Sequence, residues 1–277
     1  MPPRKSDRAP PRILAFANQK GGVGKTTTAI NLATALASDR RVLLLDLDPQ
    51  GNASTGLGIP RTERSAGSYA LLVEGRPLAE LIRPTQVPSL AILPADPDLA
   101  GAEIELVGLE RREHRLAEAL AAGADTLRDY DYIFFDCPPS LGLITLNALV
   151  AAEGVLVPLQ TEFFALEGIS QITRTIERVR RSLNPRLQLE GIVLTMVDRR
   201  NNLSELVASD VRGFFKDKVY ETVIPRNVRV SEAPSHGLPV LLYDFRSPGA
   251  QAHVRLAVEF LKREKARSRA SMNSTPQ

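Results

Sequence analysis

Short apolar runs alternate along this chain with longer segments in which apolar residues recur every three or four positions. Apolar runs of this kind are typical of parallel strands buried on both faces, and the periodic segments are typical of amphipathic helices. We therefore expect strands at residues 13–17, 42–45, 90–93, 130–136, 155–160, 190–197 and 222–224. We expect helices at residues 26–38, 68–73, 78–82, 99–109, 111–122, 140–152, 166–183, 203–215 and 249–265.

The regular alternation of strand and helix predicts the α/β class. We expect a single doubly wound, mainly parallel sheet with helices on both faces. This domain would span residues 13–265. Residues 1–12 are rich in Pro and Arg, and residues 266–277 contain few apolar side chains, so we expect two disordered tails.

A glycine-rich segment at residues 18–28 lies between the first predicted strand and the first predicted helix, and reads Asn-Gln-Lys-Gly-Gly-Val-Gly-Lys-Thr-Thr-Thr. Glycines allow the backbone to curl around a phosphate, and the helix that follows presents free N–H groups to it. Lys25 can reach the terminal phosphates, and the Thr26 hydroxyl can bind Mg²⁺. The segment departs from the general phosphate-loop pattern because Gln19 replaces the first glycine and an additional lysine, Lys20, follows.

Acidic residues follow two of the predicted strands. Asp46 and Asp48 come after the run at 42–45, and Asp136 closes the run at 130–136. In open α/β sheets ligands bind at the carboxyl ends of the strands, so these carboxylates should lie near the phosphate loop. A carboxylate there can orient a water or hold Mg²⁺ through water. The neighbouring Cys137 is interpreted as a small buried residue.

The amino-acid composition excludes several classes of protein for this chain. The chain has 277 residues, of which 43% are hydrophobic and 24% charged, as in a globular protein with a sizeable core. It has one cysteine, which excludes a disulfide framework and a Cys-rich metal site. No apolar run approaches the length of a membrane span, and the N-terminal segment lacks the apolar stretch of a secretory signal.

The net charge of +3 is unevenly distributed. Residues 1–12 and 261–277 together carry +7, so the rest of the chain carries −4, but residues 174–229 have a local excess of +5. Any electrostatic attraction for nucleic acid must therefore come from that segment and from the tails. A solvated charged face remains the alternative interpretation for each individual residue.

Five motifs together resemble those of the ParA/Soj chromosome-partitioning ATPases. They read Lys-Gly-Gly-Val-Gly-Lys-Thr-Thr from residue 20, Asp-Leu-Asp-Pro-Gln-Gly-Asn from 46, Phe-Asp-Cys-Pro-Pro-Ser from 135, Ala-Leu-Glu-Gly from 165 and Ile-Pro-Arg-Asn-Val-Arg-Val-Ser-Glu-Ala-Pro-Ser-His-Gly from 224. The resemblance covers about residues 13–260, and the second and last motifs are the most specific. The phosphate loop alone is shared by the whole deviant Walker A group, which also contains MinD.

The resemblance implies an ATPase that uses ATP and Mg²⁺, slow without its partner, in which catalysis rests on Lys20, Lys25 and Asp48. Lys20 resembles the signature lysine that reaches the partner's nucleotide in an ATP-bound homodimer, and Asp48 resembles the hydrolytic aspartate. The resemblance implies an ATP-binding set of Lys20, Gly21, Gly22, Val23, Gly24, Lys25, Thr26, Thr27, Pro225 and Asn227. Metal candidates are Thr26, Asp136 through water, and Asp46 as an additional candidate.

The resemblance further implies that the ATP-bound dimer binds double-stranded DNA without sequence preference. A ParB-type centromere-binding protein would then stimulate hydrolysis and release the dimer. The DNA-binding candidates are Arg199, Arg200, Lys216, Lys218, Arg226, Arg229 and Arg246. The implied location is the cytoplasm, in association with the nucleoid.

Two other functions have a phosphate loop in common with this one. A MinD-like regulator that cycles on membranes needs a C-terminal amphipathic helix with bulky apolar residues, whereas Met272 is the only large apolar residue of 262–277. A metabolic P-loop enzyme, such as an ATP-dependent ligase, needs a separate substrate pocket, and we identify no residues for one in the sequence.

Overall fold

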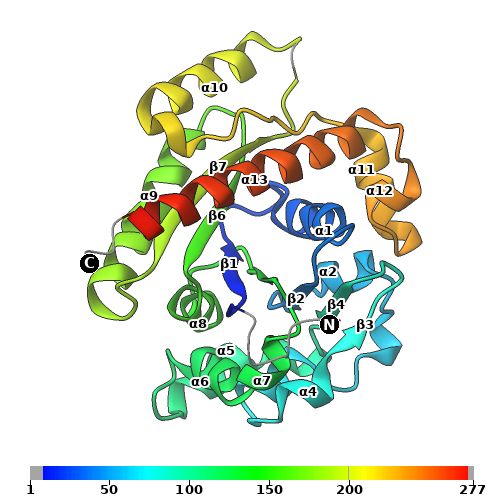
Figure 1. Cartoon of the computed structure of the whole chain (residues 1–277), viewed down its shortest axis with the longest axis vertical. Helices are drawn as coiled ribbons and strands as arrows, with labels where there is room; N and C mark the ends of the chain where they lie inside the picture. Colours follow the sequence, from blue (N-terminus) through cyan, green and yellow to red (C-terminus); the bar gives the residue numbers. More distant parts are fainter. Residues whose placement is uncertain (1–8, 199, 274–277) are drawn as a thin grey trace.

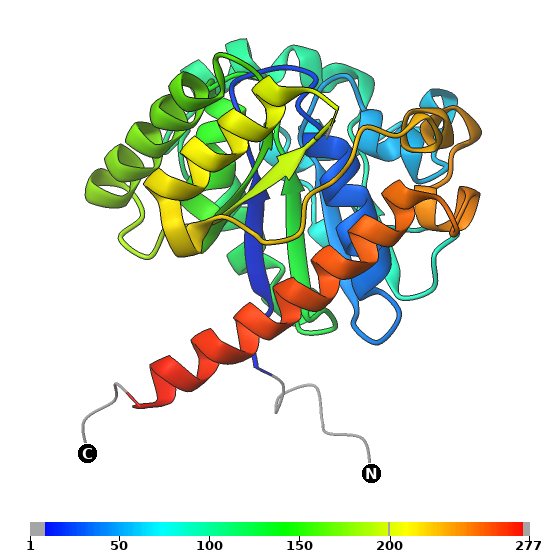
Figure 2. The ribbon, with the colours of Figure 1, turned by 90° about the horizontal axis from the view of Figure 1, so that it is seen from above.

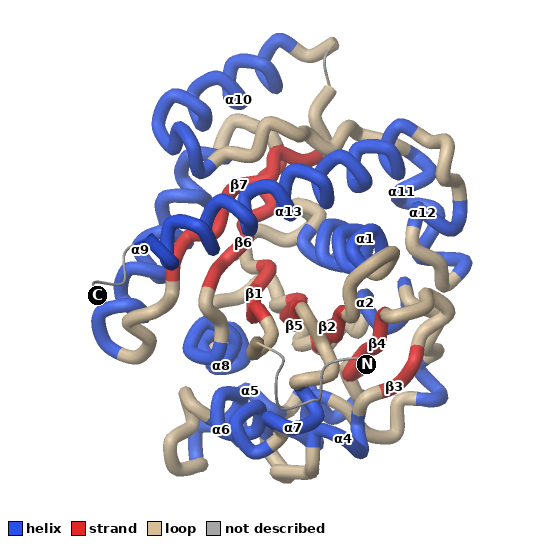
Figure 3. Tube along the Cα trace, in the orientation of Figure 1, coloured by secondary structure: helices blue, strands red, loops and turns tan. Residues whose placement is uncertain are grey.

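A seven-stranded sheet runs through the middle of the molecule in the order β3-β4-β2-β5-β1-β6-β7 (Figures 1 and 3). The computed structural model describes residues 9–198 and 200–273. All neighbouring strands are parallel except β3 and β4. The strands are β1 (Arg12–Phe16), β2 (Val42–Asp46), β3 (Arg83–Pro84), β4 (Leu90–Leu93), β5 (Tyr132–Asp136), β6 (Gly154–Gln160) and β7 (Gln188–Thr195).

Helices cover both faces of the sheet, as the sequence predicts. The α-helices are α1 (Lys25–Leu36), α2 (Asn52–Gly56), α3 (Ser68–Leu72), α4 (Leu78–Leu81), α5 (Ala102–Glu105), α6 (Arg115–Ala122), α7 (Ala124–Leu127), α8 (Leu143–Ala151), α9 (Ala165–Ser182), α10 (Asn202–Phe215), α11 (Val228–Glu232), α12 (Val240–Tyr243) and α13 (Pro248–Asn273). Short 3₁₀ turns are η2 (Arg61–Glu63), η3 (Pro97–Ala100), η4 (Leu106–Gly108), η5 (Lys216–Lys218) and η6 (Ala233–His236).

Alternating side chains divide the core into two layers, because successive residues of a strand point to opposite faces. Leu14 and Phe16 of β1 pack with α1 and α13 on one face. Ala15 of the same strand packs on the other face with α3, α6, α8 and α9. Strands buried on both sides explain why the chain reads there as continuous apolar runs.

The parallel register brings the predicted acidic residues to one edge. Asp136 is aligned with Phe16 of β1 on one side and with Asp46 of β2 on the other. The loop that follows β1 therefore leaves the sheet beside both carboxylates, at the carboxyl ends of the strands. The fold class and this placement confirm the α/β prediction.

Two predicted elements differ from the structure. Residues 222–224 form no strand, and only isolated bridges join this region to β7 and Val197. The Glu259 carboxylate of α13 accepts the backbone N–H groups of Glu221 and Thr222 at 2.8 and 2.9 Å, so they are not available to a strand ladder. The helix predicted at 99–109 is divided into η3, α5 and η4.

The predicted tails are shorter than expected. Arg12 belongs to β1 and is buried, because Glu153 and Glu190 accept its guanidinium at 2.5 and 2.8 Å and Glu264 lies 3.6 Å away. Helix α13 continues to Asn273, so residues 266–273 are helical; Arg267 and Ser268 both bond back to Glu264. The other predicted tail residues, 1–8 and 274–277, lie outside the described part of the chain.

Within the described residues, no helix combines the length and apolarity that crossing a membrane requires. Figure 2 shows α13 extending past the edge at which the parallel strands begin. This edge is opposite the one that carries Asp46 and Asp136.

Candidate nucleotide site

The phosphate loop connects the end of β1 to Lys25, the first residue of α1. Gly24 caps the helix with φ of +86°, and Gly22 has φ of +73°, conformations in which a Cβ is strained. The Thr28 hydroxyl closes the first turn by donating to the Gly24 carbonyl at 2.7 Å. The free N–H groups of the helix therefore point toward the loop, as an anion site requires.

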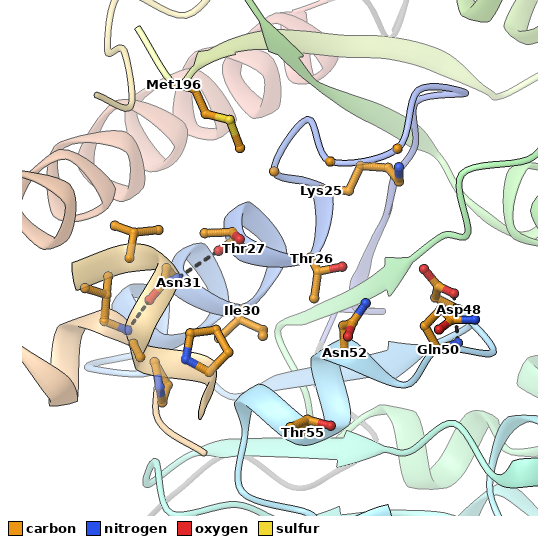
Figure 4. Close-up of a pocket in the computed structure, with 18 of the residues that line it drawn as sticks. Lys25, Thr26, Thr27, Ile30, Asn31, Asp48, Gln50, Asn52, Thr55 and Met196 are labelled. Carbon is orange, nitrogen blue, oxygen red and sulfur yellow. Dashed lines mark hydrogen bonds between the residues drawn. The ribbon is translucent and has the colours of Figure 1, made fainter. Parts of the chain in front are cut away.

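A cavity of about 380 Å³ opens in front of this loop (Figure 4). Figure 4 shows Thr26 of α1, Asn52 of α2 and Asp48 facing one another across it. Its lining includes Gly21, Gly22, Gly24, Lys25, Thr26, Thr27, Ile30, Asn31, Asp48, Gln50, Asn52, Thr55 and Met196. Six of the predicted phosphate-loop residues are thus brought together with Asp48 around one space, whereas Lys20 and the buried Val23 do not line it.

Lys25 is almost fully buried at the base of the loop. Its ammonium donates to the Lys20 carbonyl at 3.0 Å. Burial lowers the pKa of Lys25, and the charges of Asp136, Cys137 and Asp48 oppose that shift. A desolvated ammonium with one weak partner gains strongly from an anion, which suits a phosphate ligand.

Asp48 and Asp46 differ in what their carboxylates contact. Asp48 lines the cavity, and among the described residues one of its oxygens accepts only the Gln50 N–H, at 3.0 Å. Asp46 is fully buried, and its oxygens accept Ser54 N, Ser54 Oγ and Asp48 N. Burial raises the pKa of Asp46 to about 6, against the effect of the Ser54 hydrogen bonds. Asp46 thus holds the turn that follows β2, and its predicted contact with metal stays a prediction.

Asp136 fits a magnesium site better. Neither of its buried oxygens has a hydrogen-bond partner among the described residues. Burial and the neighbouring Asp46 raise the pKa of Asp136, whereas the Thr26 hydroxyl and Lys25 lower it. An orphaned carboxylate beside the first hydroxyl of α1 matches the oxygen donors that Mg²⁺ prefers.

Cys137 lies directly after Asp136 and is fully buried. Burial and the Asp136 charge raise the pKa of its thiol. The residue is therefore a small core side chain, as the sequence predicts.

Lys20 lies at the rim of the same loop, and its side chain is about half exposed. Its ammonium forms an ion pair with Glu162, which lies between β6 and α9. The Lys20 backbone is held by Asn18 Oδ1, which accepts its N–H at 3.1 Å. The two lysines of the loop thus have different environments: Lys25 faces the buried base, and Lys20 faces the surface.

Pro225 and Asn227 line a second cavity of about 240 Å³, which shares Gly24, Thr27 and Met196 with the first. Asn227 caps α11, because its side chain accepts the Val230 N–H at 3.3 Å. The two residues therefore lie beside the nucleotide cavity, and their predicted contact with adenine stays a prediction.

Sequence reasoning missed two residues that shape the cavity. Asn31 donates to the Thr27 carbonyl and accepts Val240 N–H at 2.8 Å, which joins α1 to α12. Arg64 is buried and donates to the carbonyls of Gly51 and Ile59, which holds the turn after Asp48. A polar residue inside an apolar helical stripe marks Asn31 in the sequence, whereas no local pattern marks Arg64.

Comparison with known proteins shows that the chain is similar to chromosome-partitioning proteins of several bacteria. ParA of Caulobacter vibrioides, named a chromosome partitioning protein, is 60% identical over 93% of this chain and 97% of the relative. Soj of Bacillus subtilis is 53% identical over 90% of this chain and 97% of the relative. The chromosome-partitioning ATPase Soj of Thermus thermophilus is 53% identical over 92% and 98%. The profile of a family described as an AAA domain matches residues 11–189.

This chain belongs to the ParA/Soj family of chromosome-partitioning ATPases. Two solved structures have a fold similar to that of this chain. Cobyrinic acid a,c-diamide synthase of Mycobacterium smegmatis, solved with ADP and magnesium, is 38% identical over 92% of this chain and 96% of its own, with a TM-score of 0.79. MinD of Pyrococcus horikoshii, solved with Mg-ADP, is 27% identical over 90% and 95%, with a TM-score of 0.72.

The DNA-binding candidates that the ParA/Soj resemblance implied occupy several places. Arg200 and Arg226 line one surface pocket, although Arg200 also pairs with Asp198 at 3.0 Å. Lys216 and Lys218 are exposed in η5.

Arg229 is the least available of these candidates. It pairs with Glu232 at 3.0 Å and lies 3.4 Å from Asp244. Arg246 is exposed, and Arg199 lies outside the described residues. Sequence reasoning missed Arg255 of α13, which is exposed and lines the same pocket as Arg200 and Arg226.

Proposed function

We propose that this partitioning ATPase works as a nucleotide-controlled DNA-binding switch. The ATP-bound form is a homodimer that binds double-stranded DNA without sequence preference, and hydrolysis returns it to a form that leaves DNA. The observation that carries this proposal is the presence of two lysines with different placements in one phosphate loop. Lys25 is buried at the base of the cavity and serves its own subunit, whereas Lys20 is at the rim, where a second subunit can be reached.

ATP and Mg²⁺ are the ligands of the cavity. The loop amides and Lys25 bind the phosphates, since a desolvated ammonium and the free N–H groups of α1 both favour an anion. Thr26 and Asp136 hold the magnesium ion, Asp136 through water. The ion supplies neutralisation of the phosphate charge.

Asp48 is the residue that we assign to hydrolysis. It is the carboxylate that lines the cavity with an oxygen bonded only to a backbone amide, so it can accept a proton from an attacking water or orient that water. Lys20 of the second subunit then stabilises the charge that develops on the transferred phosphoryl group. A cation supplied in trans in this way is worth roughly 10³–10⁵ in rate in related P-loop enzymes.

We propose that DNA contacts this protein at the surface pocket that Arg200, Arg226 and Arg255 line. The exposed Lys216 and Lys218 of η5 are further candidates for DNA contacts. Cations at phosphate spacing bind DNA through its backbone, and such contacts carry no sequence information. Dimerisation doubles the number of contacts, so binding becomes useful only in the ATP state.

The partner that triggers hydrolysis is a ParB-type centromere-binding protein, as in the family resemblance. We place the protein in the cytoplasm, associated with the nucleoid through its ATP-bound form. A membrane-cycling function and a metabolic ligase function are the competing outcomes of the test below.

The test is a titration of a labelled DNA duplex with ATP, with ADP and without nucleotide, at several salt concentrations. We expect tight binding only with ATP, equal for duplexes of different sequence. Six phosphate contacts per dimer predict a loss of about 10³ in affinity between roughly 50 and 200 mM salt. The Asp48→Ala variant should bind DNA with ATP for much longer, because it cannot hydrolyse the nucleotide.

The Arg226→Glu variant provides a matched control, since it should still dimerise with ATP but no longer bind the DNA duplex. Binding that is sequence-specific, insensitive to salt or equal in all nucleotide states would contradict the proposal. Rapid ATP turnover by Asp48→Ala would remove that residue from the hydrolytic role.

A further inference from the structure

The most unusual feature of the phosphate loop is that the Lys20 ammonium contacts a carboxylate of its own subunit. Its partner, Glu162, lies 142 positions away in the sequence, between the end of β6 and the start of α9. The pair exists because β6 is the parallel neighbour of β1, which brings both chain segments to the same edge.

The backbones on both sides of this pair are fixed. The Asn18 side-chain amide donates to the Pro158 carbonyl at 2.8 Å, and the Ala17 N–H donates to the Leu156 carbonyl at 3.3 Å. Glu162 N–H donates to Gln160 at 3.0 Å, and its carbonyl accepts from Ala165 at 2.9 Å. Separation of Lys20 from Glu162 therefore requires only side-chain rotation.

The pair contributes little to folding. Its side chains are 47% and 30% exposed, and exposed ion pairs add little to protein stability. The pair has a larger effect on the position of the Lys20 ammonium than on stability. A lysine that is held by a carboxylate of its own subunit is not free to reach the nucleotide of a second subunit. The pair is thus better suited to controlling Lys20 than to stabilising the fold.

We propose that Glu162 is a positioning residue that holds Lys20 within its own subunit until nucleotide is bound and a second subunit arrives. This inference rests on the proposed function of Lys20 in trans. Glu162 competes with the phosphate of the second subunit for the same ammonium, so it sets a threshold for dimerisation. In an empty or ADP-bound subunit, Lys20 stays paired with Glu162. ATP carries more negative charge than ADP, so ATP in the second subunit draws the Lys20 ammonium across the interface.

The other lysine of the loop links this exchange to nucleotide binding. Lys25 donates to the Lys20 carbonyl, and Lys20 donates to the Glu162 carboxylate. In both pairs a protein oxygen is the acceptor that a phosphate oxygen would replace. Phosphates that attract Lys25 remove one of the two hydrogen bonds that hold the Lys20 backbone. Loading of the first subunit therefore changes the contacts of the residue that carries the ammonium, while the bond to Asn18 Oδ1 keeps the Lys20 backbone in place.

The first experiment compares ATP-dependent dimerisation of Glu162→Gln with that of the wild type by analytical ultracentrifugation, in the Asp48→Ala background that prevents turnover. Loss of one exposed pair predicts a gain of about two- to fivefold for each subunit, hence roughly four- to 25-fold in the dimer dissociation constant. The gain should shrink at high salt, where the wild-type pair is screened. Glu167→Gln is the matched control, because this exposed acid of α9 carries the same charge and pairs with no cation in the described structure.

The Lys20→Ala variant separates failure of this inference from failure of the proposed function. If Lys20 does not act in trans, Lys20→Ala dimerises with ATP as the wild type does. If Lys20 acts in trans but Glu162 does not hold it, Lys20→Ala loses the dimer while Glu162→Gln matches or weakens the wild type. If both hold, Glu162→Gln tightens the dimer, and the gain disappears when Lys20→Ala is added.

A second measurement reads the ion pair directly in the nucleotide-free monomer. The rate at which a water-soluble acylating reagent modifies Lys20, followed by mass spectrometry, should rise about two- to fivefold in Glu162→Gln and stay unchanged in Glu167→Gln. An unchanged Lys20 rate would overturn the inference without touching the proposed function. Loss of ATP binding by Glu162→Gln would also overturn it, because Glu162 would then belong to the loaded site.

Discussion

At the scale of single residues, environment separates two lysines that are five positions apart. Lys25 has lost most of its contact with water, and its strongest neighbours are the carboxylates at the strand ends. Lys20 keeps about half of its exposure and has one carboxylate partner. In the proposed function, the same side-chain chemistry serves nucleotide binding in one case and communication between subunits in the other.

Replacement of Lys25 by Ala should reduce ATP affinity by about 100-fold or more, since the charged contact with the phosphates is lost. Isothermal titration calorimetry on the monomer would measure the change. Lys20→Ala is the comparison, and its ATP affinity as a monomer should stay within about threefold of the wild type. An equal loss in both variants would mean that Lys20 also serves its own subunit.

At the scale of elements, the start of β1 is fixed by acids from three other parts of the chain. Arg12 joins β1 to Glu153 before β6, to Glu190 of β7 and to Glu264 of α13. Glu190 and Glu264 are both about nine-tenths buried. Burial of Glu264 raises its pKa, and the nearby Arg12 opposes that shift. One guanidinium therefore connects the middle of the sheet to the last helix.

The Arg12→Met variant should lose about 3 kcal/mol of unfolding free energy, because it leaves the buried Glu190 without its cation and leaves Glu264 with Arg267 alone. Urea denaturation followed by circular dichroism would measure this loss. Arg40→Met provides the control at the same edge, since Arg40 pairs with its exposed neighbour Asp39, and it should change stability by less than about 0.5 kcal/mol. A loss of the same small size in Arg12→Met would show that water reaches the acids and replaces the arginine.

At the scale of the whole molecule, one buried histidine links folding to pH. His253 of α13 is fully buried, and its Nδ1 bonds with the Gly249 carbonyl at 2.9 Å. Burial lowers its pKa to about 4 from the ordinary 6.5, against the effect of that hydrogen bond. Unfolding releases the imidazole to take up a proton, so its contribution is complete above pH 6.5 and is lost as the pH falls toward 4.

The pH profile of the unfolding free energy should therefore be less steep in His253→Gln than in the wild type. The difference between the two profiles should change by about 3 kcal/mol between pH 6.5 and 4. Asp46, with its pKa raised to about 6, acts in the opposite direction and is present in both proteins, so the difference isolates the histidine. His236→Gln, at an exposed histidine, should leave the slope unchanged, and a parallel pair of profiles for His253→Gln would contradict the assignment.

The parts of the fold that depend on local sequence could be predicted. The run Val42–Asp46 is buried throughout, and the phosphate loop lies between strand and helix as its glycines indicate. Because parallel strands end at a common edge, the carboxylates Asp48 and Asp136 could be placed near that loop without coordinates.

Features that depend on residues distant in the sequence could not be predicted. Residues 222–224 look like a strand, but Glu259 takes the backbone groups that a strand would use. Arg12 looks like part of a basic tail until Glu153, Glu190 and Glu264 are placed around it. The contact of Lys20 with Glu162 has the same origin, since only the neighbouring order of β1 and β6 creates it.

The shared position of Ala9 and Arg267 has a practical consequence for handling the protein. Ala9 and Arg267 line the same surface pocket, at the edge where the parallel strands begin (Figure 2). This edge is opposite the phosphate loop, so a label or a surface anchor attached at Ala9 or Arg267 is far from the nucleotide and from Lys20. Immobilised molecules held in this way would keep the ATP cavity facing the solution, and a second subunit could still approach it.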